Sequence, residues 1–195
     1  MKKRILVIGI TMAAAGSEKS FLSFANTIDY EKYDVDLLLA RKTGGFLPLV
    51  PEKIRILEMG ALGELFEINR KNARSVILKR YLLKNPFRCF GLFPHLMKIK
   101  RAENPERRSF AANRMWLSMM EKMPDFPGEY DIALAYWGDR TMFYMIDKVH
   151  AKRKIAWLHF DYSRPPREDA LYREYFRRCD KVVTVSTEIE KSLKA

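Results

Sequence analysis

The chain has 195 residues, of which 48% are hydrophobic and 12% are aromatic, and its formal net charge is +12. A chain of this size and composition can bury a core without disulfides or structural metals, which excludes the disordered and the disulfide-stapled classes. No apolar run approaches the ~20 residues that a membrane-crossing helix needs. We therefore expect one domain that is soluble or bound to a membrane surface.

The first 26 residues combine a strand, a loop of small residues and the start of a helix. Residues 4–10 are almost wholly apolar, as in a central parallel strand that is covered by helices on both faces. The loop spans residues 11–18, and residues 19–26 have a helical pattern. Because a helix that begins at the carboxyl end of a strand aims free N–H groups at an anion, this segment predicts a phosphate or nucleotide crevice.

Two well-known phosphate loops do not fit this segment. A P-loop has four residues between its first glycine and a Gly-Lys-Ser/Thr triplet, whereas six residues separate Gly9 from Gly16 and Lys19 does not follow a glycine. The dinucleotide fingerprint Gly-x-Gly-x-x-Gly is absent, and the second strand runs into Arg41 and Lys42 instead of an acidic residue. Nucleotide binding at this loop is therefore expected to be of another type.

A secretory signal is the alternative interpretation of the first residues, since a basic start is followed by an apolar run and three alanines. Its removal would delete the first strand of the α/β pattern. The two cysteines, Cys89 and Cys179, do not indicate a disulfide framework. We therefore expect a cytoplasmic protein, with peripheral association at the inner face of the cell membrane.

Strands and helices alternate along the rest of the chain. Strand patterns occupy residues 34–40, 54–59, 131–136, 154–160 and 181–186. Helical patterns occupy residues 139–150, residues 168–178 and most of residues 61–123, with breaks at Pro86, Gly91, Pro94 and Pro105. The alternation predicts an α/β fold with a Rossmann-like, doubly wound parallel sheet and a helical insertion around 61–123. Because the sequence stops about two turns into a further helix, we expect residues 1–195 to be one domain of a longer protein.

The order of four motifs resembles a known family. The motifs are Ala-Gly-Ser-Glu-Lys at 15–19, Tyr-Asp-Ile-Ala-Leu-Ala-Tyr at 130–136, Ile-Ala-Trp-Leu-His-Phe-Asp-Tyr at 155–162 and Cys-Asp-Lys-Val-Val-Thr-Val-Ser at 179–186. Together they resemble the N-terminal domain of a GT-B glycosyltransferase of glycosyltransferase family 4. The resemblance covers both ends of the chain and is weak from about residue 60 to residue 125.

That resemblance implies a fold and an activity. Residues 1–195 would be the N-terminal, acceptor-side half of a GT-B fold, and the donor-binding half would follow in the full protein. The full protein would transfer a sugar, with retention, from a nucleotide-sugar donor to a saccharide or lipid-linked acceptor, in cell-surface or capsular polysaccharide synthesis. The fragment alone would be inactive or nearly so.

The resemblance also implies roles for the loop after the first strand. Gly16 and Ser17 would face the donor diphosphate, while Glu18 and Lys19 would open the helix. Ala15 stands where the family has the first of two glycines, which removes one position that takes a positive φ cheaply. Glu18 is equally explained as an ordinary acidic residue in the first helical turn.

Two strand ends carry the remaining candidates. By the resemblance, His159 lies beside the transferred sugar, and Asp161 can orient it or a substrate hydroxyl; the alternative is a histidine satisfied by backbone groups. Tyr136 and Trp137 with Asp139 would give a sugar an aromatic platform beside a carboxylate. A core tryptophan and a helix-capping aspartate explain the same cluster equally well.

No metal site is expected, because the three histidines lack ligand spacing and the Asp34-Val35-Asp36 triplet fits the entrance of a strand. Nor does any Ser or Cys constellation indicate nucleophilic catalysis. We expect no cofactor apart from the nucleotide-sugar co-substrate.

The excess charge is concentrated in the middle of the chain. Residues 69–108 contain twelve Lys or Arg residues and two Glu residues, which is +10 of the total of +12. Basic residues among aromatic and aliphatic ones suit an anionic membrane surface. The residues predicted to form this patch are Lys79, Arg80, Lys84, Arg88, Lys98, Lys100 and Arg101.

A polyanion would use the same charge, but no RNA-binding motif accompanies it, so we expect no nucleic acid. A solvated basic face over core helices remains a further alternative.

An interpretation of another class also remains open for the whole chain: a stand-alone α/β nucleotide-binding or interaction module with a basic face. It differs from the first in predicting no further catalytic domain.

Overall fold

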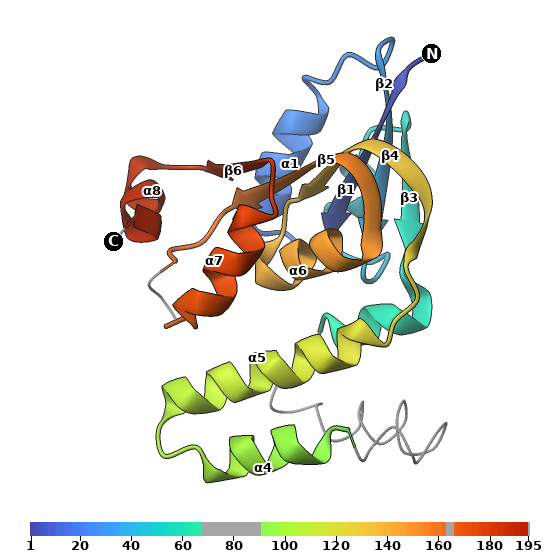
Figure 1. The fold of residues 1–195 in the computed structure, drawn as a ribbon. Helices are drawn as coiled ribbons and strands as arrows, with labels where there is room; N and C mark the ends of the chain where they lie inside the picture. Colours follow the sequence, from blue (N-terminus) through green and yellow to red (C-terminus); the bar gives the residue numbers. More distant parts are fainter. Residues whose placement is uncertain (68–90, 163–165, 195) are drawn as a thin grey trace.

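The computed structural model describes residues 1–67, 91–162 and 166–194. Six strands form one sheet in the order β3-β2-β1-β4-β5-β6, and every neighbouring pair is parallel (Figure 1). The strands are β1 (Lys3–Gly9), β2 (Tyr33–Leu39), β3 (Ile54–Glu58), β4 (Phe126–Ala135), β5 (Val149–Leu158) and β6 (Lys181–Thr184). The chain runs outward from β1 to β3, returns to β4 beside β1, and runs outward again. This order confirms the prediction of a Rossmann-like, doubly wound α/β fold.

Helices cover both faces of the sheet. They are α1 (Gly16–Ala25), α4 (Phe93–Arg101), α5 (Pro105–Glu121), α6 (Gly138–Lys148), α7 (Asp169–Arg177) and α8 (Thr187–Lys194), with 3-10 turns η1 (Leu47–Leu49) and η2 (Gly60–Leu65). Along β1, Ile5 and Val7 pack in the cluster that contains α1, whereas Leu6 and Ile8 pack in the cluster that contains α5, α6 and α7. β1 is thus buried on both faces, which explains its unbroken apolar sequence.

Several element boundaries differ from the predicted ones. α1 begins at Gly16, three residues before the predicted start. β4 begins at Phe126 and β5 at Val149, each five residues early, and Glu129 pairs with His150 in the added ladder. These added segments are largely exposed, so no apolar alternation marks them in the sequence.

The predicted helical insertion is helical where the structure describes it, in η2, α4 and α5. α5 is anchored to η2 by the indole of Trp116, which donates a hydrogen bond to the Leu65 carbonyl at 2.7 Å. α5 also begins where a break was predicted, because Asn104 accepts a hydrogen bond from the Arg107 amide at 2.8 Å and Pro105 suits the first turn. The described helices of the insertion, α4 and α5, lie as a layer beneath the sheet (Figure 1).

A buried carboxylate ties together strands β1 to β4. Asp36 accepts two hydrogen bonds from Arg55, at 2.8 and 2.6 Å, and one from the Tyr130 hydroxyl at 2.7 Å, while Arg4 lies 3.6 Å away. Burial opposes ionisation of Asp36, but the bonds from Arg55 and Tyr130 outweigh it and hold the pKa of this carboxyl below its ordinary range. The Asp34 to Asp36 triplet is accordingly part of a structural network.

Candidate functional site

The strand order places a topological switch point between β1 and β4, where the chain leaves the sheet in opposite directions. Ligands of open α/β sheets bind at the carboxyl ends of the strands at such a point. The elements that meet there are the loop after β1, the start of α1 and the loop after β4. The predicted site residues of these loops therefore belong to one edge of the sheet.

The start of α1 is open. Ala15 is the N-cap residue in an extended conformation, and none of the described side chains caps the helix. Gly16 is exposed, its φ is not positive, and a Cβ placed on it would meet nothing within 4 Å. The substitution of Ala15 for glycine thus requires no unusual backbone, and the first turn remains accessible to an anion.

Trp137 fills the base of the switch point. A Cβ on Gly9 would lie 2.8 Å from its ring, so this glycine makes room for the indole. Trp137 is 5% exposed and Tyr136 is fully buried, with Phe21 of α1 packed on both rings. The prediction of an open aromatic platform for a sugar is therefore corrected: both rings belong to the core, because α1 covers this face of the sheet.

Three ring nitrogens around Tyr136 have no hydrogen-bond partner. They are Nε1 of Trp137, Nε1 of Trp157 and Nε2 of His159, each buried and each without a partner among the described residues. The ring centroids of these residues lie 5.1, 5.2 and 4.7 Å from that of Tyr136. Buried polar groups normally find a partner, so a cluster of unpartnered ones marks a place where a ligand or an ordered water can bind.

Glu18 connects this cluster to the start of α1. Its side chain is buried at 5% exposure and accepts a hydrogen bond from the Ser17 hydroxyl at 2.6 Å. Burial lowers the pKa of His159, and the negative charge of Glu18 offsets part of that effect. His159 is consequently neutral at pH 7 and can donate or accept a hydrogen bond without carrying charge.

Asp161 is at an exposed position, and it does not orient His159 through Nε2, because that nitrogen has no partner. Asp139 does not cap α6, since it lies in the first turn of the helix. Its carboxylate accepts hydrogen bonds from the Tyr172 hydroxyl at 2.6 Å and from Arg167 Nε at 3.2 Å. Asp139 thus takes part in a structural hydrogen-bond network with Tyr172 and Arg167.

Arg167 is a residue that the sequence did not single out. Its side chain is 7% exposed, and it donates hydrogen bonds to the Asp161 and Tyr162 carbonyls at 3.0 and 2.6 Å. Its guanidinium also lies 4.2 Å from the ring centroid of Phe160. Arg167 thus holds the segment that follows His159. No local pattern reveals this role, because the pair with Asp139 spans 28 residues.

The described part of the predicted basic patch lies on another element than this cluster. Lys98, Lys100 and Arg101 lie on α4, while Lys79, Arg80, Lys84 and Arg88 lie outside the described residues. Lys19 is exposed on α1. Within residues 1–67, 91–162 and 166–194, no group of three or more His, Cys, Asp or Glu side chains could hold a metal ion. In the same ranges no helix is both long and apolar enough to cross a bilayer.

Comparison with solved structures gives a weak structural similarity. A crystal structure of TcCGT1 in complex with UDP aligns with a TM-score of 0.34 and 12% identity, over 89% of this chain and 32% of that one. The chain thus spans about a third of the length of that protein. No family model matches the sequence, and no curated protein matches it.

Proposed function

We propose that this chain is the N-terminal, acceptor-side half of a retaining glycosyltransferase of the GT-B, family 4 type. The full protein would move a sugar from a nucleotide-sugar donor to a saccharide or lipid-linked acceptor in cell-surface or capsular polysaccharide synthesis. The observation that carries the proposal is the open start of α1 at the switch point of the parallel sheet, next to Glu18 and His159. Uncapped N–H groups at a helix start suit the diphosphate of a sugar nucleotide. No cofactor is needed besides this co-substrate.

The start of α1 is suited to the donor diphosphate. Exposed backbone at Gly16 allows close approach, and the helix terminus supplies N–H groups and a partial positive charge. Lys19, exposed one turn into the helix, adds a full charge. When the diphosphate leaves, these groups stabilise the developing negative charge without having to reorganise.

His159 and Glu18 are suited to the sugar. A neutral His159 can donate a hydrogen bond to a ring hydroxyl, because burial keeps its pKa low. The carboxylate of Glu18 lies near the same imidazole, where it can stabilise positive charge that develops on the sugar as the leaving group departs. We assign exposed Asp161 to contact with an acceptor or a second domain.

A stand-alone nucleotide-binding module is the second candidate, and the Rossmann-like strand order with an open α1 terminus favours it. Both candidates predict nucleotide binding at the same edge. They differ in sugar transfer by the longer protein, which only the first predicts.

Ligand binding with matched charge variants tests the proposed site. The chain is titrated with a panel of nucleoside diphosphates and their sugar conjugates, and binding is followed by NMR chemical shifts. Ser17→Asp places a carboxylate at the start of α1 and should weaken binding about tenfold, from the helix-terminus charge effect. Ser23→Asp adds the same charge to the exposed far end of the same helix and should leave binding nearly unchanged. Equal effects of the two variants, or no binding by any member of the panel, would contradict the proposed site.

A further inference from the structure

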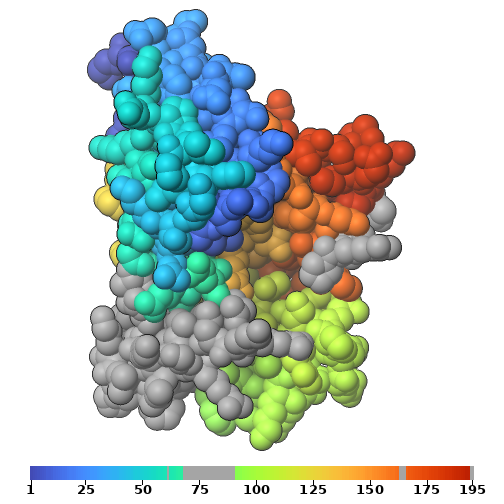
Figure 2. All heavy atoms as spheres, turned by 180° about the vertical axis from the view of Figure 1, so that it is seen from behind, coloured from blue at the N-terminus to red at the C-terminus, as the bar shows by residue number. Residues whose placement is uncertain are grey.

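Among the residues that the structure describes, the helix α4 has few partners. None of its nine residues is buried, and it packs mainly against α5. Phe93 is 62% exposed and Leu96 is 41% exposed, which makes them two of the large apolar side chains most open to solvent. Figure 2 shows the α4 and α5 hairpin, in green, at the end of the molecule opposite the N-terminus. Two exposed apolar side chains on one short helix make it a candidate contact surface.

A groove of about 1000 Å³ lies between α4, α5 and the start of α7. Its apolar lining consists of Phe93, Pro94, Met97, Ala102, Phe110 and Ala111. Its charged and polar lining consists of His95, Lys98, Arg101, Arg107, Arg114 and Glu168. Phe93, Met97 and Arg101 follow one another at intervals of four residues, so one face of α4 changes from apolar to cationic along the helix. The groove therefore has an apolar part and a cationic part, which are complementary to the acyl chains and the charged headgroup of an anionic phospholipid.

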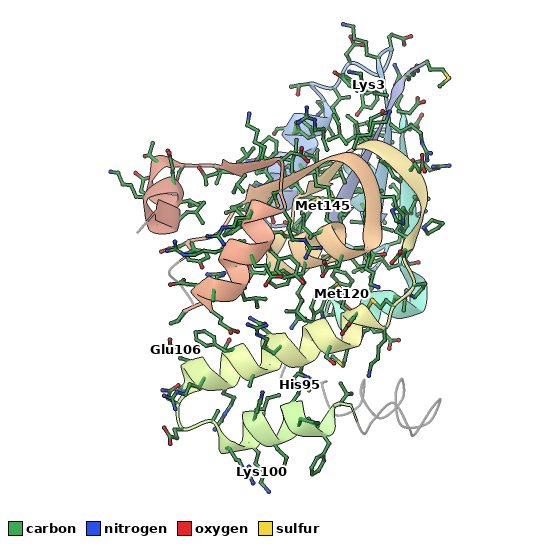
Figure 3. The ribbon with its side chains drawn as sticks, viewed as in Figure 1. Lys3, His95, Lys100, Glu106, Met120 and Met145 are labelled. Carbon is green, nitrogen blue, oxygen red and sulfur yellow. The ribbon has the colours of Figure 1, made fainter. Side chains whose placement is uncertain are left out.

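The positive charge of the groove is only partly neutralised. Arg114 donates two hydrogen bonds to the carboxylate of Glu168, at 2.9 and 2.6 Å. Lys98 and Arg101 have no ion pair or side-chain hydrogen bond with any of the described residues. These two cations face the groove, whereas Lys100 points away from α5 (Figure 3).

His95 also lies in this positive field. It is placed between α4 and α5 (Figure 3), and its Nδ1 is buried without a partner among the described residues. Burial lowers the pKa of His95, and the nearby charges of Lys98 and Lys122 lower it further. The groove therefore presents to an anion two cations, Lys98 and Arg101, that have no ion pair within the described part of the chain.

We propose that this groove docks the chain on an anionic phospholipid surface, with Lys98 and Arg101 contacting headgroup phosphates and Phe93 entering the acyl boundary. The charge is complementary to anionic headgroups, and the exposed apolar residues are complementary to acyl chains. A nucleic acid would satisfy only the charge, because phosphate binding does not require Phe93 and Leu96 to be exposed.

Docking there would bring the candidate site to the membrane. The Arg114 to Glu168 pair joins α5 to the loop that runs from His159 into α7. The groove thus contacts Glu168 at one end of the chain segment that begins at His159. The lipid proposal stands apart from the proposed transferase activity, because vesicle binding requires no donor, acceptor or second domain.

The test measures partition of the full 195-residue chain onto vesicles by sedimentation. Vesicles of equal parts phosphatidylglycerol and phosphatidylcholine should bind the chain, and phosphatidylcholine vesicles should not. Changing Lys98→Gln together with Arg101→Gln should weaken binding about 30-fold, since each basic residue near the surface contributes ~1 kcal/mol. Lys181→Gln with Lys191→Gln removes the same charge from other exposed positions and should have a small effect.

The proposed contact of Phe93 with acyl chains is tested by separate variants. Phe93→Ala should weaken vesicle binding about tenfold, whereas Leu49→Ala, which shortens a side chain that is 61% exposed elsewhere, should not. Thermal melts establish that each variant folds. Equal partition onto both kinds of vesicle, no partition onto either, or equal effects of the groove and control variants would overturn the proposal. Binding to duplex DNA as tightly as to vesicles, unaffected by Phe93→Ala, would overturn it in favour of a polyanion.

Discussion

Replacing Arg167 with methionine tests whether the segment after β5 is held as the structure indicates. The guanidinium is 7% exposed and donates hydrogen bonds to Asp139 and to the carbonyls of Asp161 and Tyr162. Methionine keeps much of the apolar volume against Phe160 but removes every donor. The side chain of Asp139 is 23% exposed, and it then retains only the Tyr172 hydroxyl as a hydrogen-bond donor among the described residues, since its second oxygen is already buried without one.

Removing one partner of a largely buried ion pair costs about 3–5 kcal/mol, because the other charge is left unpaired. The exposed fraction of Asp139 places the expected loss near the lower end, at about 3 kcal/mol. In a chain of this length each kcal/mol lowers the Tm by about 2–4 °C, so Arg167→Met should lower it by about 6–12 °C.

Thermal and urea unfolding of three variants measure this effect. Arg153→Met is the matched control, since Arg153 is 70% exposed in its ion pair with Asp180 and should lose less than about 1 kcal/mol. Adding Asp139→Asn to Arg167→Met should recover about 1–2 kcal/mol, because the stranded charge is removed. A loss for Arg167→Met no greater than that of the control, or no recovery in the double variant, would refute the assigned role of Arg167.

Three further predictions concern the core and its pH dependence. Tyr130→Phe removes a hydrogen bond to buried Asp36 and should lower the free energy of unfolding by about 1–2 kcal/mol at pH 7. The loss should be smaller at pH 3, because the pH then approaches the lowered pKa of Asp36 and the stabilisation by its carboxylate fades in both proteins. Urea unfolding at the two pH values measures this difference. The pKa of His159 is lowered in the folded state, so the unfolded state binds the proton first and stability falls as the pH drops below about 6.5. His159→Gln should reduce the change of the unfolding free energy between pH 7 and pH 5. An unchanged slope would contradict the burial of the imidazole. Gly63→Ala places a Cβ 1.7 Å from a backbone oxygen and should cost about 3 kcal/mol, whereas Gly45→Ala meets nothing within 4 Å and should fold normally, as circular dichroism melts can establish.

The central strands were predictable because burial on both faces leaves a clear trace in the sequence. The apolar residues of β1 and β2 identify these strands, and their carboxyl ends meet at one edge in any parallel sheet. The added length of β4 and β5 was not predictable, since the pairing of Glu129 with His150 lies outside the core and leaves no apolar alternation.

The candidate site was predictable only in part. Ser17, Glu18 and His159 could be assigned to one edge because each follows or ends a strand pattern. The sequence left open whether Trp137 lies in the core or forms an open platform, because the choice depends on the absence of a side chain at Gly9 in the neighbouring strand. The role of Arg167 could not be predicted either, because the fold alone brings its contact residues to it. Local patterns carry no information on such contacts.

Binding of a nucleotide-sugar beside His159 is tested most directly by the NMR signal of the His159 ring during titration of the chain. The ring resonances of His159 should shift and saturate with a nucleotide-sugar of the panel, Ser17→Asp should weaken this response, and Ser23→Asp should preserve it. A nucleotide-sugar that binds while leaving the His159 ring unchanged, with shifts confined to other parts of the chain, would show that the donor does not bind at this edge of the sheet.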